Sequence, residues 1–91
     1  MNKIRRQELS NASELIEKAK CLLEEAKGII ETSKDEEQEY YDNMPESFKS
    51  SDKGYSAEEA VSKLEEAFYE IDSIIENCDS VISSIDDAKY A

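Results

Sequence analysis

An unbroken apolar repeat from Ala57 to Lys89 constrains the fold of this chain more than any other feature. Its apolar residues return at alternating steps of four and three, and neither proline nor glycine interrupts them. This spacing predicts one long helix over about residues 57–89. When the segment is written as heptads labelled a to g, the apolar positions are a (Val61, Phe68, Ile75, Ile82), d (Ala57, Leu64, Ile71, Cys78, Ile85) and g (Ala60, Ala67, Ile74, Val81, Ala88).

A second helical repeat covers about residues 3–43. The a positions are large and the d positions are small. The members are Leu9, Ile16, Leu23 and Ile30 at a, Ala12, Ala19, Ala26 and Ser33 at d, and Leu15, Leu22 and Ile29 at g. Asn11 and Glu14 have the spacing of a capping box, which favours a late helix start that leaves residues 1–10 frayed or separate.

The connection between the two repeats is predicted to be a loop over residues 44–55. Pro45 ends the first helix, because it lacks an amide proton and disfavours the helical conformation at Met44. Gly54 is the expected residue with positive φ. Ser56 with Glu59 forms a second capping box, which predicts the start of the second helix.

Two long helices joined by a short loop favour an antiparallel hairpin. The sequence therefore predicts an all-α fold in which residues 1–91 form a single helical-hairpin domain. In the register that we prefer, small d residues of the first helix face large a residues of the second, as for Ala26 with Ile75 and Ala19 with Ile82. Such alternation fills the space between helices without voids.

The same register brings oppositely charged residues together along the e positions. It predicts three salt bridges between the helices: Lys20 with Asp79, Lys27 with Asp72, and Lys34 with Glu65. Because exposed ion pairs contribute little stability, these pairs are expected to select the register rather than to drive folding.

The g positions form an apolar edge that has no counterpart within a two-helix hairpin. Its large members are Leu15, Leu22, Ile29, Ile74 and Val81. Contiguous apolar strips of this size usually mark an interface. We expect a homodimer or higher oligomer, with two hairpins forming a four-helix bundle. The alternative is that residues 1–10 fold over this edge as a short third helix anchored by Ile4 and Leu9.

The chain is strongly acidic, with 23 acidic residues, 11 basic residues and a net charge of −12. This sign disfavours direct binding to nucleic acid or to an anionic membrane, and it favours a basic protein partner. The candidate partner surface combines acidic and aromatic residues near the loop end. Its members are Glu36, Glu39, Tyr41, Phe48, Tyr55, Glu59 and Glu66. No apolar run has the length of a signal peptide or of a membrane span, so a cytoplasmic location is expected.

The sequence offers little for catalysis or cofactor binding. It has no histidine, no Gly-rich phosphate loop and no calcium-loop spacing, and its two cysteines lie 57 positions apart. We therefore predict no enzymatic activity, no catalytic residues, no cofactor and no metal site. Cys21 falls at an exposed f position and Cys78 at d in the interface between the helices, and both are expected to stay reduced.

The segment Tyr41–Phe48, which reads YDNMPESF, precedes two Ala-rich acidic motifs, AEEA from Ala57 and LEEA from Leu64. Residues 36–70 thereby resemble small, uncharacterised acidic helical-hairpin proteins of bacteriophages and mobile elements. The NMPE turn at Asn43 is the distinctive part of the likeness, and the N-terminal helix is not covered. The resemblance implies a phage or mobile-element setting in the cytoplasm of a bacterial host cell, and it carries no activity over to this chain.

Three functions are compatible with these patterns. The first is a self-associating interaction protein whose acidic surface antagonises a host defence or DNA-binding protein. The second is a passive structural or accessory protein whose acidity provides only solubility. The third is a nucleotide-binding sponge, for which Lys3, Arg5 and Arg6 are the only clustered basic residues.

Overall fold

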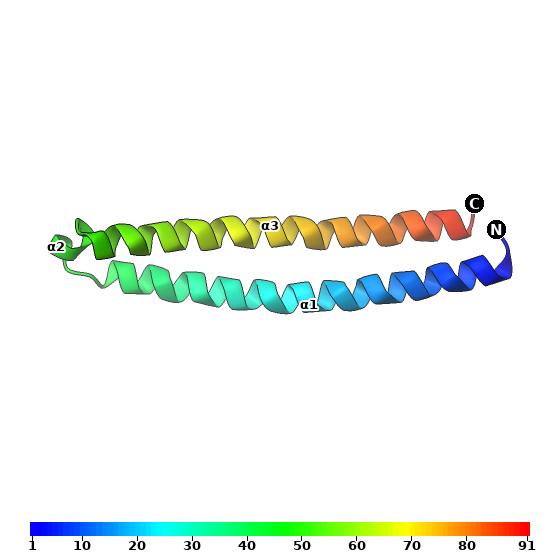
Figure 1. Ribbon diagram of the computed structural model, residues 1–91, viewed down its shortest axis with the longest axis horizontal. Coiled ribbons are helices and arrows are strands. Elements are labelled where there is room, and N and C mark those ends of the chain that lie inside the picture. The colour runs from blue at the N-terminus through cyan, green and yellow to red at the C-terminus, as the bar shows by residue number, and fades with distance from the viewer.

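A computed structural model describes residues 1–91 as three helices. Helix α1 spans Lys3–Asp42, the short helix α2 spans Glu46–Lys49, and α3 spans Asp52–Lys89. α1 and α3 lie side by side and antiparallel along their length, α2 caps one end, and the two chain termini lie together at the other end (Figure 1). The predicted all-α hairpin is confirmed. We call the end with α2 the loop end and the other the open end.

The hairpin is an extended rod rather than a globule. It measures 68 × 16 × 14 Å, and its radius of gyration of 20.3 Å exceeds the roughly 12 Å of a compact domain of this length. Its accessible surface is 6566 Å², whereas a globular protein of the same mass exposes about 5,400 Å². Only Gly54, Ala57 and Ile75 are buried. One chain alone therefore has a line of contact between two helices but no enclosed core.

Helix α1 begins at Lys3, as the repeat over residues 3–43 predicts, and not at the alternative Asn11 capping box. Asn2 is the N-cap, and its side-chain oxygen accepts a hydrogen bond of 2.8 Å from the backbone amide of Arg5. Residues 3–10 continue α1 and form no separate helix. The alternative in which they cover the apolar edge is therefore wrong, and Ile4 is 73% exposed.

The turn is also more helical than the predicted loop over residues 44–55. Helix α2 lies within that range, and α3 begins at Asp52 with Ser51 as its N-cap, so Ser56 lies inside α3. The hydroxyl of Ser51 donates to the carbonyl of Phe48 at 2.5 Å instead of capping α3.

Gly54 does not adopt the positive φ expected of it, since no residue of the chain does. It is a buried helical residue packed against the end of α2, where an added Cβ would lie 2.6 Å from the Cα of Lys49. Glycine is needed at this position because it lets two backbones approach closely. This contact allows the chain to reverse direction within a short segment.

The open end is held by Lys89, whose side chain is only 13% exposed. Its ammonium group donates to the hydroxyl of Ser10 at 3.2 Å and lies 3.2 Å from the carboxylate of Asp86. Lys89 is the last residue of α3, so the part of α1 before Ser10 extends beyond the end of α3. The N-terminal turn of α1 therefore has no helix of its own chain beside it.

Candidate interaction surfaces

The two long edges of the hairpin differ in chemistry. We define the charged edge as Lys20, Lys27, Lys34, Glu65, Asp72 and Asp79. The apolar edge consists of Leu15, Leu22, Ile29, Ile74 and Val81. A third region, the loop-end surface, comprises Glu36, Glu39, Tyr41, Phe48, Tyr55, Glu59 and Glu66.

Two of the three salt bridges predicted for the charged edge are present. The ammonium of Lys20 lies 2.8 Å from Asp79, and that of Lys27 lies 2.5 Å from Asp72. The hydrogen bond to the carboxylate raises the pKa of each lysine above its usual value, against an opposing effect of partial desolvation. Together with the contact between Lys89 and Ser10, these pairs agree with the predicted register.

The predicted pair of Lys34 with Glu65 does not form. The ammonium of Lys34 lies 3.9 Å from Asp35 and 5.6 Å from the centre of the Phe68 ring. Lys27 lies over the same ring at 4.9 Å. Phe68 is a large residue opposite the small Ser33, so its ring offers both lysines a cation–π contact. That contact and the adjacent carboxylate take the place of the expected salt bridge.

The apolar edge is exposed along its length. On α1, Leu15, Leu22 and Ile29 are 65%, 67% and 66% exposed, and on α3, Ile74 and Val81 are 48% and 46% exposed. Beyond these residues the g positions of α1 are occupied by Glu8 and Glu36, and those of α3 become alanine. The strip of large apolar side chains is thus bounded at both ends, and no segment of the chain covers it.

The predicted members of the loop-end surface lie on all three helices toward the loop end. Tyr41 is half-buried, and the ammonium of Lys49 lies 5.4 Å from the centre of its ring. Partial desolvation raises the pKa of the Tyr41 hydroxyl, and the nearby Glu58 carboxylate adds to the effect. The other predicted members are all exposed: Glu36, Glu39, Phe48, Tyr55, Glu59 and Glu66.

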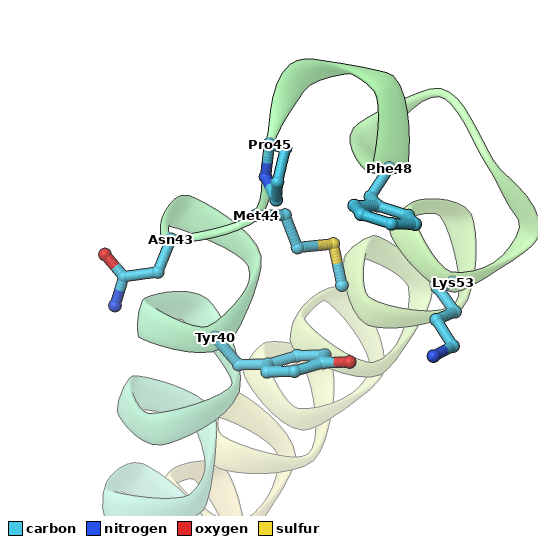
Figure 2. Close-up of a pocket in the computed structure, with 6 residues that line it drawn as sticks. All are labelled: Tyr40, Asn43, Met44, Pro45, Phe48 and Lys53. Carbon is cyan, nitrogen blue, oxygen red and sulfur yellow. The ribbon is translucent and has the colours of Figure 1, made fainter.

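A shallow hollow of about 360 Å³ lies beside this surface. The side chains of Tyr40, Met44 and Phe48 point toward one another across it, Lys53 lies at its rim, and Asn43 points away (Figure 2). The sequence predicts an aromatic cluster here but not the hollow. The hollow depends on α2, whose helical geometry brings Phe48 back over Met44, and this geometry is absent from a predicted loop.

Negative charge is concentrated toward the loop end. When the rod is divided at its midpoint according to the observed register, the loop-end half contains residues 27–74, with five basic and fourteen acidic residues, a net charge of −9. The open-end half contains residues 1–26 and 75–91, with six basic and nine acidic residues, a net charge of −3. The loop-end half of the rod is therefore more negatively charged than the open-end half.

The remaining candidate chemistry is sparse. Cys21 is exposed, Cys78 is half-buried between the helices, and both are free thiols. No cluster of three or more Cys, Asp or Glu side chains could hold a metal ion. None of the helices is both long enough and apolar enough to cross a membrane.

Comparison with protein families, curated proteins and solved structures returned no match for this chain. The surfaces described above therefore carry the functional argument.

Proposed function

We propose that this chain is a small self-associating binding module, in which the apolar edge packs against a second copy and the loop-end surface binds a basic protein. The observation that carries the proposal is the separation of these two surfaces on one rigid rod. An uncharged apolar strip lies on one edge, and most of the excess negative charge lies toward one end.

The exposed area supports self-association. The chain exposes about 1,200 Å² more surface than a globular protein of its mass. A stable protein–protein interface buries about 800 Å² on each partner. Packing two hairpins through their apolar edges would remove an excess of this size and would form a four-helix bundle with a continuous core.

The chemistry of the loop end supports a basic protein as its partner. Its carboxylates attract Lys- and Arg-rich surfaces over distances near the Debye length, which speeds encounter. Exposed aromatic residues such as Phe48 and Tyr55 add apolar anchors of the kind that contribute most to binding energy at interfaces. In a bacteriophage setting, a host defence or DNA-binding protein has the required basic surface, and the chain would act as its antagonist.

The proposal is tested by affinity capture from bacterial lysate at low salt, followed by mass spectrometry. The expected result is one basic protein that is enriched by the wild type and released by about 0.5 M salt, because salt at this level screens exposed charges. The purified partner should then bind the wild-type chain in solution.

The matched variant is Glu59→Gln and Glu66→Gln, which removes two exposed charges of α3 and preserves side-chain size. It should keep its helicity and lose the captured protein. Equal capture by both chains, or capture that resists salt, would show that the loop-end charges are not the binding determinant. Failure to enrich any basic protein would favour a passive accessory role.

A further inference from the structure

Resting on the self-association proposed above, the charge distribution also specifies how the second copy is oriented. We infer that two hairpins pack antiparallel through their apolar edges, with α1 against α1 of the other copy. Arg5 in the basic N-terminal turn of each chain, at a d position that borders the apolar edge, then lies against the acidic end of α1 in the other, whereas Lys3 and Arg6 lie on the far side of α1. The partner of the apolar edge is thus a second copy in one defined orientation and register.

Symmetry leaves two ways to pack these faces. A two-fold axis along the rod keeps both loop ends together and places α1 over α3 of the second copy. A two-fold axis across the rod puts the loop ends at opposite ends and places α1 over α1. Both arrangements superpose the large apolar residues, because Leu22 lies beside Val81 near the centre of the apolar strip. Apolar burial alone therefore does not choose between them.

Charge does choose. The arrangement with both loop ends together places two halves of net charge −9 side by side. The antiparallel arrangement places each of them largely beside a half of charge −3. Like charges in close proximity across an interface destabilise a complex. The net charges of the two halves therefore favour the antiparallel dimer, although the pair of Glu8 with Glu36 opposes it.

The N-terminal overhang provides the specific contact. With the two-fold axis at Leu22, residue i of one α1 lies opposite about residue 44 − i of the other. Arg5 then faces Glu39. Among the acidic residues at this end of α1, Glu36 and Glu39 border the apolar edge and face the second copy, so the aromatic residues and the α3 carboxylates of the loop-end surface remain for the basic protein. In the alternative arrangement, the basic turn lies beyond the end of α3 and meets no acidic helix.

The same register places Glu8 opposite Glu36, both at g positions that bound the apolar strip. This like-charge pair gives a direct test. Glu8→Lys and Glu36→Lys should each tighten the dimer roughly 3- to 30-fold, because each converts two symmetric repulsive contacts into attractive ones. The double variant restores repulsion and should return the dissociation constant to near the wild-type value. Sedimentation equilibrium measures all four constants.

Glu14→Lys is the matched control, since it makes the same change in charge at an exposed f position of α1. It reports the effect of reduced net charge alone. If the two single variants tighten the dimer no more than this control, or if their effects simply add in the double variant, the antiparallel register is overturned. A wild-type chain that stays monomeric at tens of micromolar would instead overturn the self-association itself.

Energy transfer gives a second measurement that does not depend on changed affinity. Chains carrying Cys21→Ser and Cys78→Ala are labelled with a donor at Asp35→Cys or an acceptor at Gln7→Cys, and the two are mixed. Helical rise places the two labels within about 3 Å of each other along the rod axis in the antiparallel dimer and about 42 Å apart along it in the alternative. Low transfer in a mixture that sediments as a dimer contradicts the proposal.

Discussion

Lys27 and Leu22 lie on opposite edges of the same hairpin, and their surroundings differ. The charged group of Lys27 has a carboxylate partner at 2.5 Å and an aromatic ring at 4.9 Å, both from α3 of its own chain. The side chain of Leu22 is 67% exposed and has no cover from its own chain. One edge is complete within a single molecule, and the other is not.

This difference between the charged edge and the apolar edge shows that ion pairs and apolar side chains have separate roles in a two-helix hairpin. Ion pairs at a partly exposed edge contribute little stability, but mismatched charges are unfavourable, so they select the register of α1 against α3. The apolar edge selects nothing within the hairpin. It contributes only when a second surface removes it from water, which makes it the part of the molecule available for assembly.

The largest expected effect comes from breaking the apolar edge at its centre. Leu22→Glu should weaken the dimer by more than about 100-fold, because two leucines lose their burial and two carboxylates are brought together. Sedimentation equilibrium measures the change. Cys21→Glu, which adds the same charge at the neighbouring exposed position, should leave the dimer nearly intact. Equal effects of the two variants would mean that the apolar edge is not the interface.

Substitutions at the adjacent residues Ile75 and Ile74 distinguish stability that arises within one chain from stability that arises from self-association. Ile75 is 8% exposed within one chain, so Ile75→Ala should lower the free energy of unfolding by about 2–4 kcal/mol in any background. Ile74 belongs to the apolar edge. If the proposed dimer forms, the effect of Ile74→Ala should appear in the wild-type chain and vanish in the Leu22→Glu background. Urea denaturation of the four combinations measures this, and persistence of the Ile74 effect would contradict the assignment.

Substitution of the two glycines tests whether the turn sets the register of α1 against α3, on which the charged edge and the apolar edge both depend. Gly54→Ala should destabilise the hairpin by about 1–3 kcal/mol, because its methyl group collides with the backbone of Lys49. Gly28→Ala should stabilise it by up to about 1 kcal/mol, since nothing lies within 4 Å of the added atom and alanine favours helix. Thermal unfolding measures both. If Gly54→Ala leaves the stability unchanged, the close contact between Gly54 and the backbone of Lys49 is not needed for the turn.

The charged edge should show its small contribution in alkaline solution. The pKa of Lys20 and of Lys27 is raised above 10.5 in the folded chain, so the associated stability is fully present below pH 10.5. It is lost as pH rises through the folded pKa values. The melting temperature should therefore fall above about pH 10.5, and Asp72→Asn should flatten that decline. An identical alkaline profile for the variant would show that this pair does not contribute.

Most of the fold follows from the sequence, because heptad periodicity and the alternation of small and large residues act over whole helices. Ala26 facing Ile75 and two of the charged pairs are consequences of one register. The errors are local. Ser56 with Glu59 has the chemistry of a cap, but the packing of Gly54 against α2 lets helix α3 begin a turn earlier. Lys34 has an acidic counterpart at the right spacing, but its ammonium lies beside Asp35 and over the Phe68 ring instead.

The candidate surfaces divide in the same way. The exposure of Leu15 and Leu22 follows from their g positions, since a two-helix hairpin has nothing to place there. The hollow between Tyr40, Met44 and Phe48 does not follow, because it depends on how a four-residue helix orients one ring. Whether a second chain covers the apolar edge is a property of two molecules, and a pattern in one sequence can only suggest it.

The packing of Gly54 against Lys49 also bears on the order in which the hairpin forms. These residues are close in sequence, whereas Lys89 and Ser10, which hold the other end, are 79 positions apart. Loop closure costs more entropy as the loop grows. Contacts between α1 and α3 are therefore expected to form first beside the turn and last at the open end. Amide hydrogens near Ala57 should then exchange most slowly and those near Lys89 most quickly. The basic N-terminal turn of α1 lies beyond the last of these contacts, so its amide exchange should slow when a second chain covers it.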